Sequence, residues 1–491
     1  MTSTMTFRPR ARAIAAILSL AVPSAAMLAQ GAKLDRDKQP VAAPTPVTRI
    51  PTWTRVRLAN GADLVVSVKK DLPLVAFAMS FVGGATSYET PDKLGEASFT
   101  AQMLSEGTAT MSADEFSSAQ QLLGTSINAS VGTEAGTIGF TALKDRFPRA
   151  LELTADMMLH PRFPAEALAR IRGRTLVALQ QARDQPNAIA ANVFAKVTYG
   201  DVHPYGRVTT EATVKAITRD DIVAFHKAYY LPGRAVISVV GDVDPAVVKA
   251  QVEKALASWP AGGSRPTFDY PPPPALNSRA IYLVDKPKAA QSVFQLGLPG
   301  PDRKTGDYFA LQVMNTLLGG LFQSRLNHNI REVKGYSYGV NSQFAFGRGP
   351  GAFRAGGGIV TAKTDSALME FMKEFNGVRG DVPFTDDEIK QGKQSLIQSL
   401  PETFASVNGI RVAAAGIYVQ ELPEDYYQQY AAKVNAVTRD DLMRVARKYI
   451  DLDHLNIVIV GDRAVVEEGL RKTGIAPIVP LDVDAKPVVQ P

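Results

Sequence analysis

The chain has 491 residues, of which 45% are hydrophobic and 21% are charged, so it can bury the cores of about two to four domains. Its formal charge of +6 gives little support for nucleic-acid binding, because Arg8, Arg10 and Arg12 supply three of the positive charges and removing them leaves +3. Cysteine is absent, which excludes disulfides, thiolate metal sites, cysteine nucleophiles and the usual bacterial lipid anchor.

The first thirty residues have the pattern of a secretory signal peptide. A basic segment at 8–12 precedes an apolar stretch at 13–22 that is too short to span a bilayer, and small residues follow. Cleavage after Ala26 fits the small-residue preference, and cleavage after Ala29 is the alternative. We therefore expect residues 1–30 to be removed and the mature protein to be periplasmic. No later segment has about twenty consecutive apolar residues, so stable membrane insertion is not expected.

Residues 31–48 are polar and contain proline, which predicts a flexible leader before a first domain at 49–262. In that domain the stretch 94–108 has helical character. Positions i, i+3 and i+4 of a helix share one face, where paired histidines and a glutamate can hold and use a metal ion. The stretch contains no histidine, so it has no such pair.

The histidines are widely separated along the chain. They are His160, His203, His226, His328 and His454, and no two lie within five residues of each other. We expect His203 to be a loop hydrogen-bonding residue and His226 to lie on a helix surface. A metal site assembled from distant histidines remains open as an alternative at this point.

One segment of the chain occurs twice. Residues 214–242 return as 434–462 with an offset of 220 and no gap, and eleven of the twenty-nine positions are identical. Thr218 and Thr438 are followed three residues later by aspartate, which predicts a capping box, an amphipathic helix and then an apolar strand. The duplication predicts two homologous α+β domains.

The boundary between these domains is rich in proline and glycine. Residues 263–279 include four consecutive prolines, which predicts a stiff, extended linker. The second domain is then expected at 280–475, followed by a tail at 476–491 that wraps the surface or frays.

The second domain contains a candidate site at 317–340. Arg331 and Tyr338 are seven residues apart, with Gly335 between them. Both side chains donate hydrogen bonds and remain protonated at neutral pH, so together they could stabilise a developing oxyanion. The alternative is a surface ion pair for Arg331, near Glu332, and a core position for the Tyr338 ring.

Glycines in this domain have structural explanations. Gly319 and Gly320 would permit close packing at a helix start, and the segment lacks the Lys-Ser/Thr of a phosphate loop. The cluster at 346–358 predicts a strand bulge or tight loop, with a mobile chamber edge as the alternative.

These segments together resemble the M16 family of zinc peptidases, the pitrilysin and mitochondrial-processing-peptidase group. Residues 94–108 are similar to its H-x-x-E-H helix, with Met103-Leu104 and Gly107-Thr108 in matching places. The resemblance then places the three motif positions at Ser98, Ala101 and Gln102, none of which carries an imidazole or a carboxylate. The HPRF segment at 160–163, the HPYG segment at 203–206 and the R-E-x-x-G-x-x-Y segment at 331–338 are also similar. Tyr336 departs from the family, whose members usually have leucine there.

The resemblance implies a fold and a missing metal site. The fold is the M16/LuxS-like metallohydrolase fold, α+β, with two homologous, mainly antiparallel sheet domains in a clam-like arrangement. The third zinc ligand of the family would fall near 177–179, where no acid occurs between Glu166 and Asp184. No metal or cofactor is therefore expected in this chain.

The resemblance also implies a division of labour between two chains. This chain is similar to the non-zinc subunit of bacterial heterodimeric M16B peptidases, in which Arg331 and Tyr338 would bind the substrate carbonyl and oxyanion. The implied partner is an H-x-x-E-H subunit that carries Zn²⁺, and the substrates are unfolded or short peptides, with no nucleic acid. The chain alone would be inactive.

Two other functions are weighed against this one. The first is an inert peptide-binding or structural module with the same fold. The second is a self-sufficient serine hydrolase, for which no G-x-S-x-G or S-x-x-K pattern is present.

Overall fold

Two mixed six-stranded sheets organise the computed structural model, which describes residues 49–275 and 278–488. The expected signal peptide at 1–30 and leader at 31–48 lie outside the described residues. Residues 48–491 form one unit by their contacts. No helix of the described residues is both long enough and apolar enough to cross a bilayer.

The first sheet has the order β1-β2-β6-β3-β5-β4, in which β2 and β6 are parallel and the other described pairs are antiparallel. Its strands are β1 (Thr54–Arg57), β2 (Asp63–Val68), β3 (Leu74–Val82), β4 (Asn128–Val131), β5 (Ala135–Leu143) and β6 (Ala235–Gly241). The helices of this half are α1 (Ala85–Tyr88), α2 (Glu96–Met103), α3 (Ala113–Leu123), α4 (Phe147–Leu159), α5 (Ala165–Ala182), α6 (Pro186–Tyr199), α7 (Glu211–Ala216), α8 (Arg219–Tyr229) and α9 (Pro245–Ala255).

The second sheet has the order β12-β7-β11-β8-β10-β9, in which β7 is parallel to both of its neighbours. Its strands are β7 (Ala280–Asp285), β8 (Gln291–Pro299), β9 (Ser337–Phe344), β10 (Ala352–Val360), β11 (Asn456–Gly461) and β12 (Ile478–Leu481). Its helices are α10 (Tyr308–Asn315), α11 (Arg325–Asn327), α12 (Thr364–Asn376), α13 (Asp386–Gln398), α14 (Leu400–Thr403), α15 (Val407–Val419), α16 (Tyr426–Ala436), α17 (Arg439–Tyr449) and α18 (Arg463–Lys472), with π-helical turns η4 (Thr316–Gly320) and η5 (His328–Val333).

The predicted duplication is visible in both sheets. Thr218 caps α8 and Thr438 caps α17, each through a capping box closed by the aspartate three residues later. The strand that follows each helix, β6 or β11, is buried along its whole length. The mainly antiparallel α+β class predicted for both halves is therefore confirmed.

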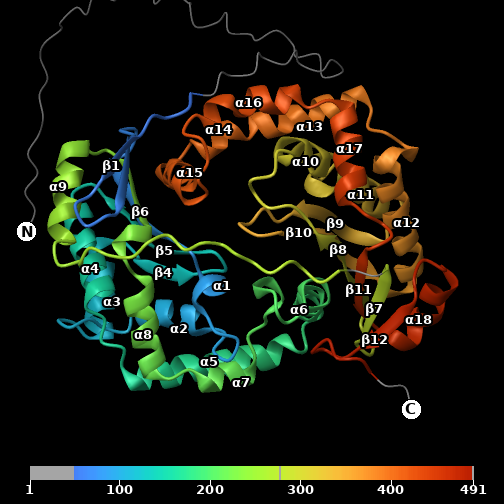
Figure 1. The fold of residues 1–491 in the computed structure, drawn as a ribbon, viewed down its shortest axis with the longest axis horizontal. Coiled ribbons are helices and arrows are strands. Elements are labelled where there is room, and N and C mark those ends of the chain that lie inside the picture. Colours follow the sequence, from blue (N-terminus) through green and yellow to red (C-terminus); the bar gives the residue numbers. More distant parts are fainter. Residues whose placement is uncertain (1–48, 276–277, 489–491) are drawn as a thin grey trace, which may run out of the picture. The chain divides into compact units, whose positions relative to one another are not determined.

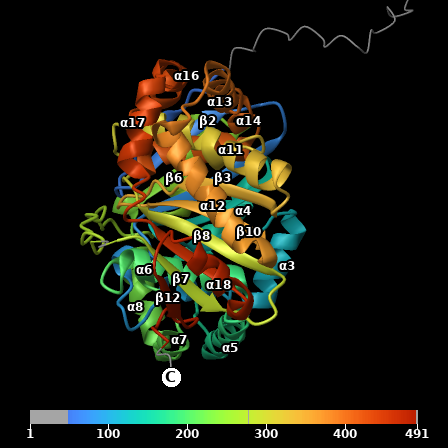
Figure 2. The ribbon, with the colours of Figure 1, turned by 90° about the vertical axis from the view of Figure 1, so that its right-hand side faces the viewer.

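Each sheet is covered on one face by helices of its own half. In the first half these helices and the strands bury one large cluster, which includes Phe77, Phe99 and Tyr229. In the second half α12 and α18 cover the corresponding face, as Figure 2 shows.

The opposite face of each sheet is covered by a helix from the other half. Helix α6 packs on β8 and β11 of the second sheet, where Val193 and Phe194 join the buried cluster (Figure 1). Helix α15 packs on β3 and β6 of the first sheet, and its alanines 413–415 allow a close approach to the strands. This reciprocal exchange joins the two halves through apolar contacts.

The ends of the second half differ from the expectation. The tail at 476–491 contributes β12, which pairs with β7 and completes the second sheet. In the described part of the first half the corresponding edge is β1, which precedes β2 in the chain. The described part of the proline-rich segment, 263–275, contains no helix or strand.

Candidate functional site

Helix α2 carries the three positions at which the family has its metal-binding motif. Its first turn is capped by Glu89, whose Oε1 accepts hydrogen bonds from the backbone of Gly95 and Ala97 at 3.0 and 2.8 Å. Ser98 and Gln102 are exposed, and Gln102 Nε2 donates to Ser98 Oγ at 3.2 Å across one turn. The helix therefore forms normally, with side chains that do not suit a metal.

The neighbouring helix α5 does not compensate for that loss. At the expected place of the third ligand Val177 is exposed and Leu179 packs against the first core. Ala101 has no donor atom and is 2% exposed. Across the described residues no group of three histidine, cysteine, aspartate or glutamate side chains is arranged to hold a metal ion. The residues at this place do not fit zinc, which needs imidazole, thiolate or carboxylate ligands.

The histidines at issue have structural contacts. His203 is buried, and its Nδ1 accepts a hydrogen bond from Tyr205 N at 3.0 Å, as expected for a loop residue. His226 is not a surface residue as expected: it is half-buried, and its Nε2 donates to Met158 O at 2.7 Å. Burial lowers the pKa of His226, so the neutral ring is favoured.

Arg331 lies in the π-helical turn η5, directly before β9. Gly335 adopts φ of +65°, a left-handed conformation that ends the helical segment. Its N–H donates to Arg331 O at 3.1 Å, and Tyr336 N donates to Ile330 O at 2.9 Å. These two bonds hold η5 against the start of β9, and so they bring Arg331 close in space to the strand that carries Tyr338.

The side chain of Arg331 has only weak local partners. Its Nε lies 3.4 Å from Glu332 Oε1, and its guanidinium lies 4.3 Å from the centre of the Phe322 ring. The ion pair matches the structural alternative that the sequence left open. Both side chains of that pair are partly exposed, so it contributes at most about 1 kcal/mol and leaves the guanidinium able to bind another group.

Tyr338 is held outward by a β-bulge. Val340 pairs with Gly357 and Ser337 pairs with Ile359, so Tyr338 and Gly339 together face a single residue of β10. Alternation from the buried Val340 would otherwise turn Tyr338 inward, but its side chain is 86% exposed. A core position for the Tyr338 ring is therefore wrong.

Ser337 stabilises this bulge. Its Oγ lies 2.7 Å from Gly358 O and accepts a hydrogen bond from Gly339 N at 3.0 Å. Sequence reasoning missed the bulge because the strand register that creates it depends on β10, a separate part of the chain.

The outer edge of β9 is occupied by side chains of its own half. Asn327 Oδ1 accepts from Val340 N at 3.1 Å, and Asn315 Nδ2 donates to Ser342 O at 3.1 Å. Gly319 lies so close that a Cβ there would come within 2.4 Å of Ser342 N, which explains the predicted need for glycine at this turn. The outward-facing N–H of Val340 and C=O of Ser342, in the middle of β9, are therefore already bonded.

The outer edge of β4 is different. Gly132 N donates to Ala135 O in the turn, so antiparallel alternation directs the N–H and C=O groups of Ala129 and Val131 away from β5. Within the described residues no side chain bonds to the backbone of β4. This strand therefore presents an open edge, which can pair with an added chain.

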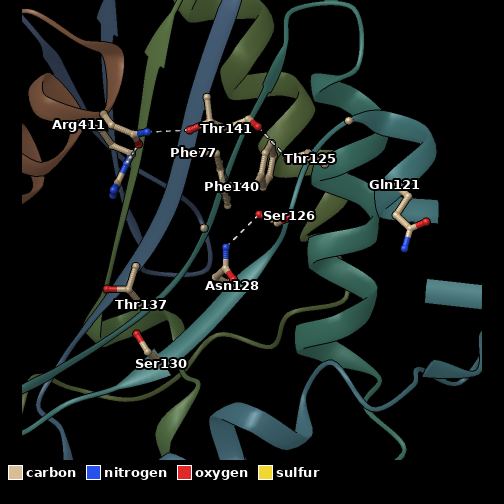
Figure 3. A pocket seen from close by; sticks show the side chains of 13 residues that line it. Phe77, Gln121, Thr125, Ser126, Asn128, Ser130, Thr137, Phe140, Thr141 and Arg411 are labelled. Atoms are coloured by element: carbon tan, nitrogen blue, oxygen red, sulfur yellow. Dashed lines mark hydrogen bonds between the residues drawn. The ribbon is translucent and has the colours of Figure 1, made fainter. Parts of the chain in front are cut away.

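A polar cavity of about 670 Å³ lies beside that edge (Figure 3). Asn128 and Ser130 of β4, Thr137 and Thr141 of β5, and Arg411 of α15 line it. Sequence reasoning missed this cavity because its two walls come from different halves of the chain.

Glu134 links the β4–β5 hairpin of the first sheet to the β9–β10 hairpin of the second sheet. This carboxylate, in the turn between β4 and β5, accepts hydrogen bonds from Tyr205 OH, from Tyr270 OH at 3.2 Å and from Arg348 N at 2.9 Å. Arg348 lies in the loop between β9 and β10, and Gly349 N in the same loop donates to Tyr205 OH at 3.0 Å. The first part of the glycine cluster therefore forms a tight, anchored loop, which is one of the two forms expected for it.

Comparison with known proteins agrees with this architecture. Residues 64–205 match the model of insulinase (peptidase family M16), and residues 216–396 match the model of the peptidase M16 inactive domain. Together the two models span most of the region 64–396.

The chain is also similar to individual proteins of this group. It is 28% identical to the zinc protease YmxG of Bacillus subtilis over 72% of this chain and 85% of that protein. A solved peptidase M16 inactive domain from Pseudomonas fluorescens is 25% identical with a TM-score of 0.77, covering 83% of this chain and 98% of that one. A protease from Helicobacter pylori is 20% identical with a TM-score of 0.78, covering 84% of this chain and all of that one, and so shares the fold. The chain belongs to the M16 peptidase family.

Proposed function

We propose that this chain is the non-zinc subunit of a two-chain M16B peptidase. Arg331 and Tyr338 bind the carbonyl of the peptide bond that is cleaved, and they stabilise the oxyanion that forms there. An H-x-x-E-H partner supplies the Zn²⁺, for which Ser98, Ala101 and Gln102 of this chain provide no ligand.

One observation carries the proposal: the bulge in β9 exposes Tyr338 next to the turn that bears Arg331. A phenol that is 86% exposed and clamped by its own strand adds nothing to the core, which suggests a role in contact with another molecule. A guanidinium and a phenol are both hydrogen-bond donors, and preorganised donors of this kind stabilise negative charge that develops in a transition state.

The open edge of β4 supports peptides as the substrates. An extended peptide can add to a free strand edge through backbone hydrogen bonds, which makes binding tolerant of sequence. The α2 positions support the need for a partner, because Ser98, Ala101 and Gln102 provide neither a metal ligand nor a general base.

The first experiment is to purify the tagged mature chain gently from its native cells and to identify every co-purifying chain by mass spectrometry. A near one-to-one H-x-x-E-H homologue is the expected result. The pair is then reconstituted with wild-type chain, Arg331→Ala or Tyr338→Phe, and cleavage of a fluorogenic peptide is measured. Loss of one donor should lower kcat by about 100- to 1000-fold.

The controls for that experiment are Tyr282→Phe and Arg149→Gln, which alter the same residue types elsewhere. Both control pairs should cleave at the wild-type rate. Wild-type rates for Arg331→Ala and Tyr338→Phe would contradict the proposed role of the two side chains.

A second candidate function is an inert peptide-binding or assembly module, and the open edge of β4 favours it equally. The two functions differ in one respect: an inert module would bind peptides but would not depend on Arg331 or Tyr338. Recovery of the chain without any H-x-x-E-H partner would favour this second function.

The proposed location is the periplasm, on the basis of the expected signal peptide at 1–30. Fractionation of the native cells tests it, and N-terminal sequencing of the mature chain would distinguish cleavage after Ala26 from cleavage after Ala29.

A further inference from the structure

We infer that the cavity between β4, β5 and α15 binds a carboxylate of a peptide that lies along β4, and that Arg411 is the residue that binds it. The inference rests on the peptide binding in the proposed function and adds a preference for acidic peptides. It is independent of whether this chain assists cleavage.

The cavity lies on the polar face of the two strands. Ile138 and Phe140 point into the core of the first half, so alternation along β5 places Thr137 and Thr141 on the opposite face. Asn128 and Ser130 of β4 are exposed on this same face. The floor of the cavity is therefore made of hydroxyl and amide groups, which can donate hydrogen bonds.

Arg411 provides the single charged side chain in the lining. Its Nε donates to Asn408 Oδ1 at 3.3 Å, and Asn408 Nδ2 donates to Thr141 Oγ1 at 3.0 Å. This chain of bonds fixes the guanidinium beside β5, and Figure 3 shows Arg411 next to Thr141 at one side of the cavity.

No acidic side chain of the described residues pairs with Arg411. Its terminal nitrogens have no hydrogen-bond acceptor there, and burial alone lowers its pKa. A half-buried cation without a counter-charge is costly, so a carboxylate that enters the cavity gains a charge-assisted interaction that water provides less well.

The geometry suits a peptide on the open edge. Strands lie about 4.8 Å apart, so a peptide paired with β4 would lie about 10 Å from β5, which is within the combined reach of a glutamate and an arginine side chain. Alternate side chains of that peptide would point to the face that carries Asn128 and Ser130. The carboxylate could come from an aspartate or glutamate side chain or from the C-terminus of the peptide.

Fluorescence anisotropy with three labelled peptides of otherwise identical, unstructured sequence tests this inference on the mature chain. The first peptide has a central glutamate and an amidated C-terminus. The second has glutamine at that position and the same amide. The third has the glutamine and a free C-terminal carboxylate.

The expected result is that one carboxylate-bearing peptide binds about tenfold more tightly than the glutamine amide. Preference for the first peptide identifies a side-chain carboxylate, and preference for the third identifies the C-terminus. The preference should disappear in Arg411→Gln and be partly kept in Arg411→Lys. Arg149→Gln, a matched arginine outside the cavity, should retain it.

Thr137→Glu gives a second route that does not remove Arg411. The new carboxylate would pair with Arg411 inside the cavity and should abolish the preference for acidic peptides. Thermal unfolding of each variant checks that it is folded.

The key quantity is the affinity for a carboxylate-bearing peptide divided by the affinity for the glutamine amide. The inference would be overturned if this ratio were the same in wild type and Arg411→Gln, or if none of the three peptides bound the wild-type chain. The cleavage assay with Arg331→Ala is independent of these ratios. If Arg331→Ala abolished cleavage while Arg411→Gln left the affinity ratio unchanged, the carboxylate subsite would be overturned and the proposed function would remain intact.

Discussion

The edge strands β4 and β9 occupy the same position in the two duplicated sheets, but they have opposite surroundings. The outer groups of β9 are bonded to Asn315 and Asn327 and packed against Gly319, whereas those of β4 have no such partners among the described residues. Conversely, β9 presents an exposed tyrosine on a bulge, and β4 carries small polar side chains. Strand β4 therefore has an edge that can pair with a peptide backbone, whereas β9 holds the side chain of Tyr338 in a fixed position.

This difference has a physical consequence for how each strand could be used. An open edge binds through repeated backbone hydrogen bonds and depends little on the peptide sequence. A capped edge cannot do this, but its fixed backbone holds Tyr338 in one place, which transition-state stabilisation requires. The first two predictions below test these two surroundings directly.

The largest effect on binding is expected from blocking backbone pairing at β4. A peptide N-methylated at two alternate residues loses the donors that would face β4 and should bind about a hundredfold more weakly, because each hydrogen bond is worth about 1.4 kcal/mol. The same peptide methylated at the intervening two residues, whose amides face solvent, is the control. Anisotropy measures both, and equal affinities would mean that peptides do not add to β4.

The next effect concerns the cap on β9. Asn327→Ala leaves the N–H of Val340 without its acceptor in a buried place, which should lower the free energy of unfolding by about 2 kcal/mol. Urea denaturation measures this value, and the exposed Asn341→Ala on the same strand is the control. The uncovered edge should also promote self-association, visible by light scattering. Unchanged stability would show that the asparagine does not protect the strand.

A smaller effect is expected in α2, the helix that packs against β4. Burial raises the pKa of Glu96 to about 7, from an ordinary value near 4.5. The folded chain therefore binds a proton that the unfolded chain has released, so this group lowers stability as pH rises from about 4.5 to about 7. Glu96→Gln should remove this loss of stability with rising pH. It should therefore raise Tm relative to wild type more at pH 8 than at pH 4.

Glu166→Gln, a substitution of the same kind at an exposed position, should show no such difference between the two pH values. A constant Tm offset for Glu96→Gln at both pH values would contradict the shifted pKa.

The smallest effect is expected at the two capping boxes, a feature that the two halves share. Thr218→Ala and Thr438→Ala each remove the side chain of a capping box and should each cost about 1 kcal/mol. Urea denaturation of the single and double variants should give additive losses, because the caps lie in different halves. Valine in place of threonine at the same positions separates the loss of the hydroxyl from the loss of volume.

Several features could be predicted from the sequence because their causes are local. The capping boxes at Thr218 and Thr438 depend on residues three positions apart, and the repeat that contains them predicted the two α+β halves. The absence of metal-ligating side chains at Ser98, Ala101 and Gln102 is likewise a property of one helix face. Gly319 was expected to permit close packing, and the structure identifies Ser342 as the group that it approaches.

Other features could not be predicted because they depend on distant segments. The exposure of Tyr338 depends on the register between β9 and β10, and periodicity within one strand does not reveal a bulge. His226 was expected on a surface, but the carbonyl of Met158 and the ring of Phe163 cover it. The segment after residue 475 was expected to fray or to wrap the surface, but β7 provides it with a pairing edge.

By itself, then, the sequence determined the class of fold, the duplication and the absence of metal-ligating side chains at Ser98, Ala101 and Gln102, since each can be recognised from residue types and their order in the chain. The role of Arg331 and Tyr338 stays a prediction. The tertiary structure alone decided which edge strand is open, that α6 and α15 exchange between the halves, and that Arg411 faces β5 across a polar cavity. The position of Arg411 depends on contacts between distant residues, such as the hydrogen bond between Asn408 and Thr141, which are 267 positions apart. The closed edge of β9 depends on the nearer residues Asn315 and Asn327, which reach it only once the segment has folded back on the strand. No local pattern encodes such pairs, because their energy is gained only after both halves have folded and packed together.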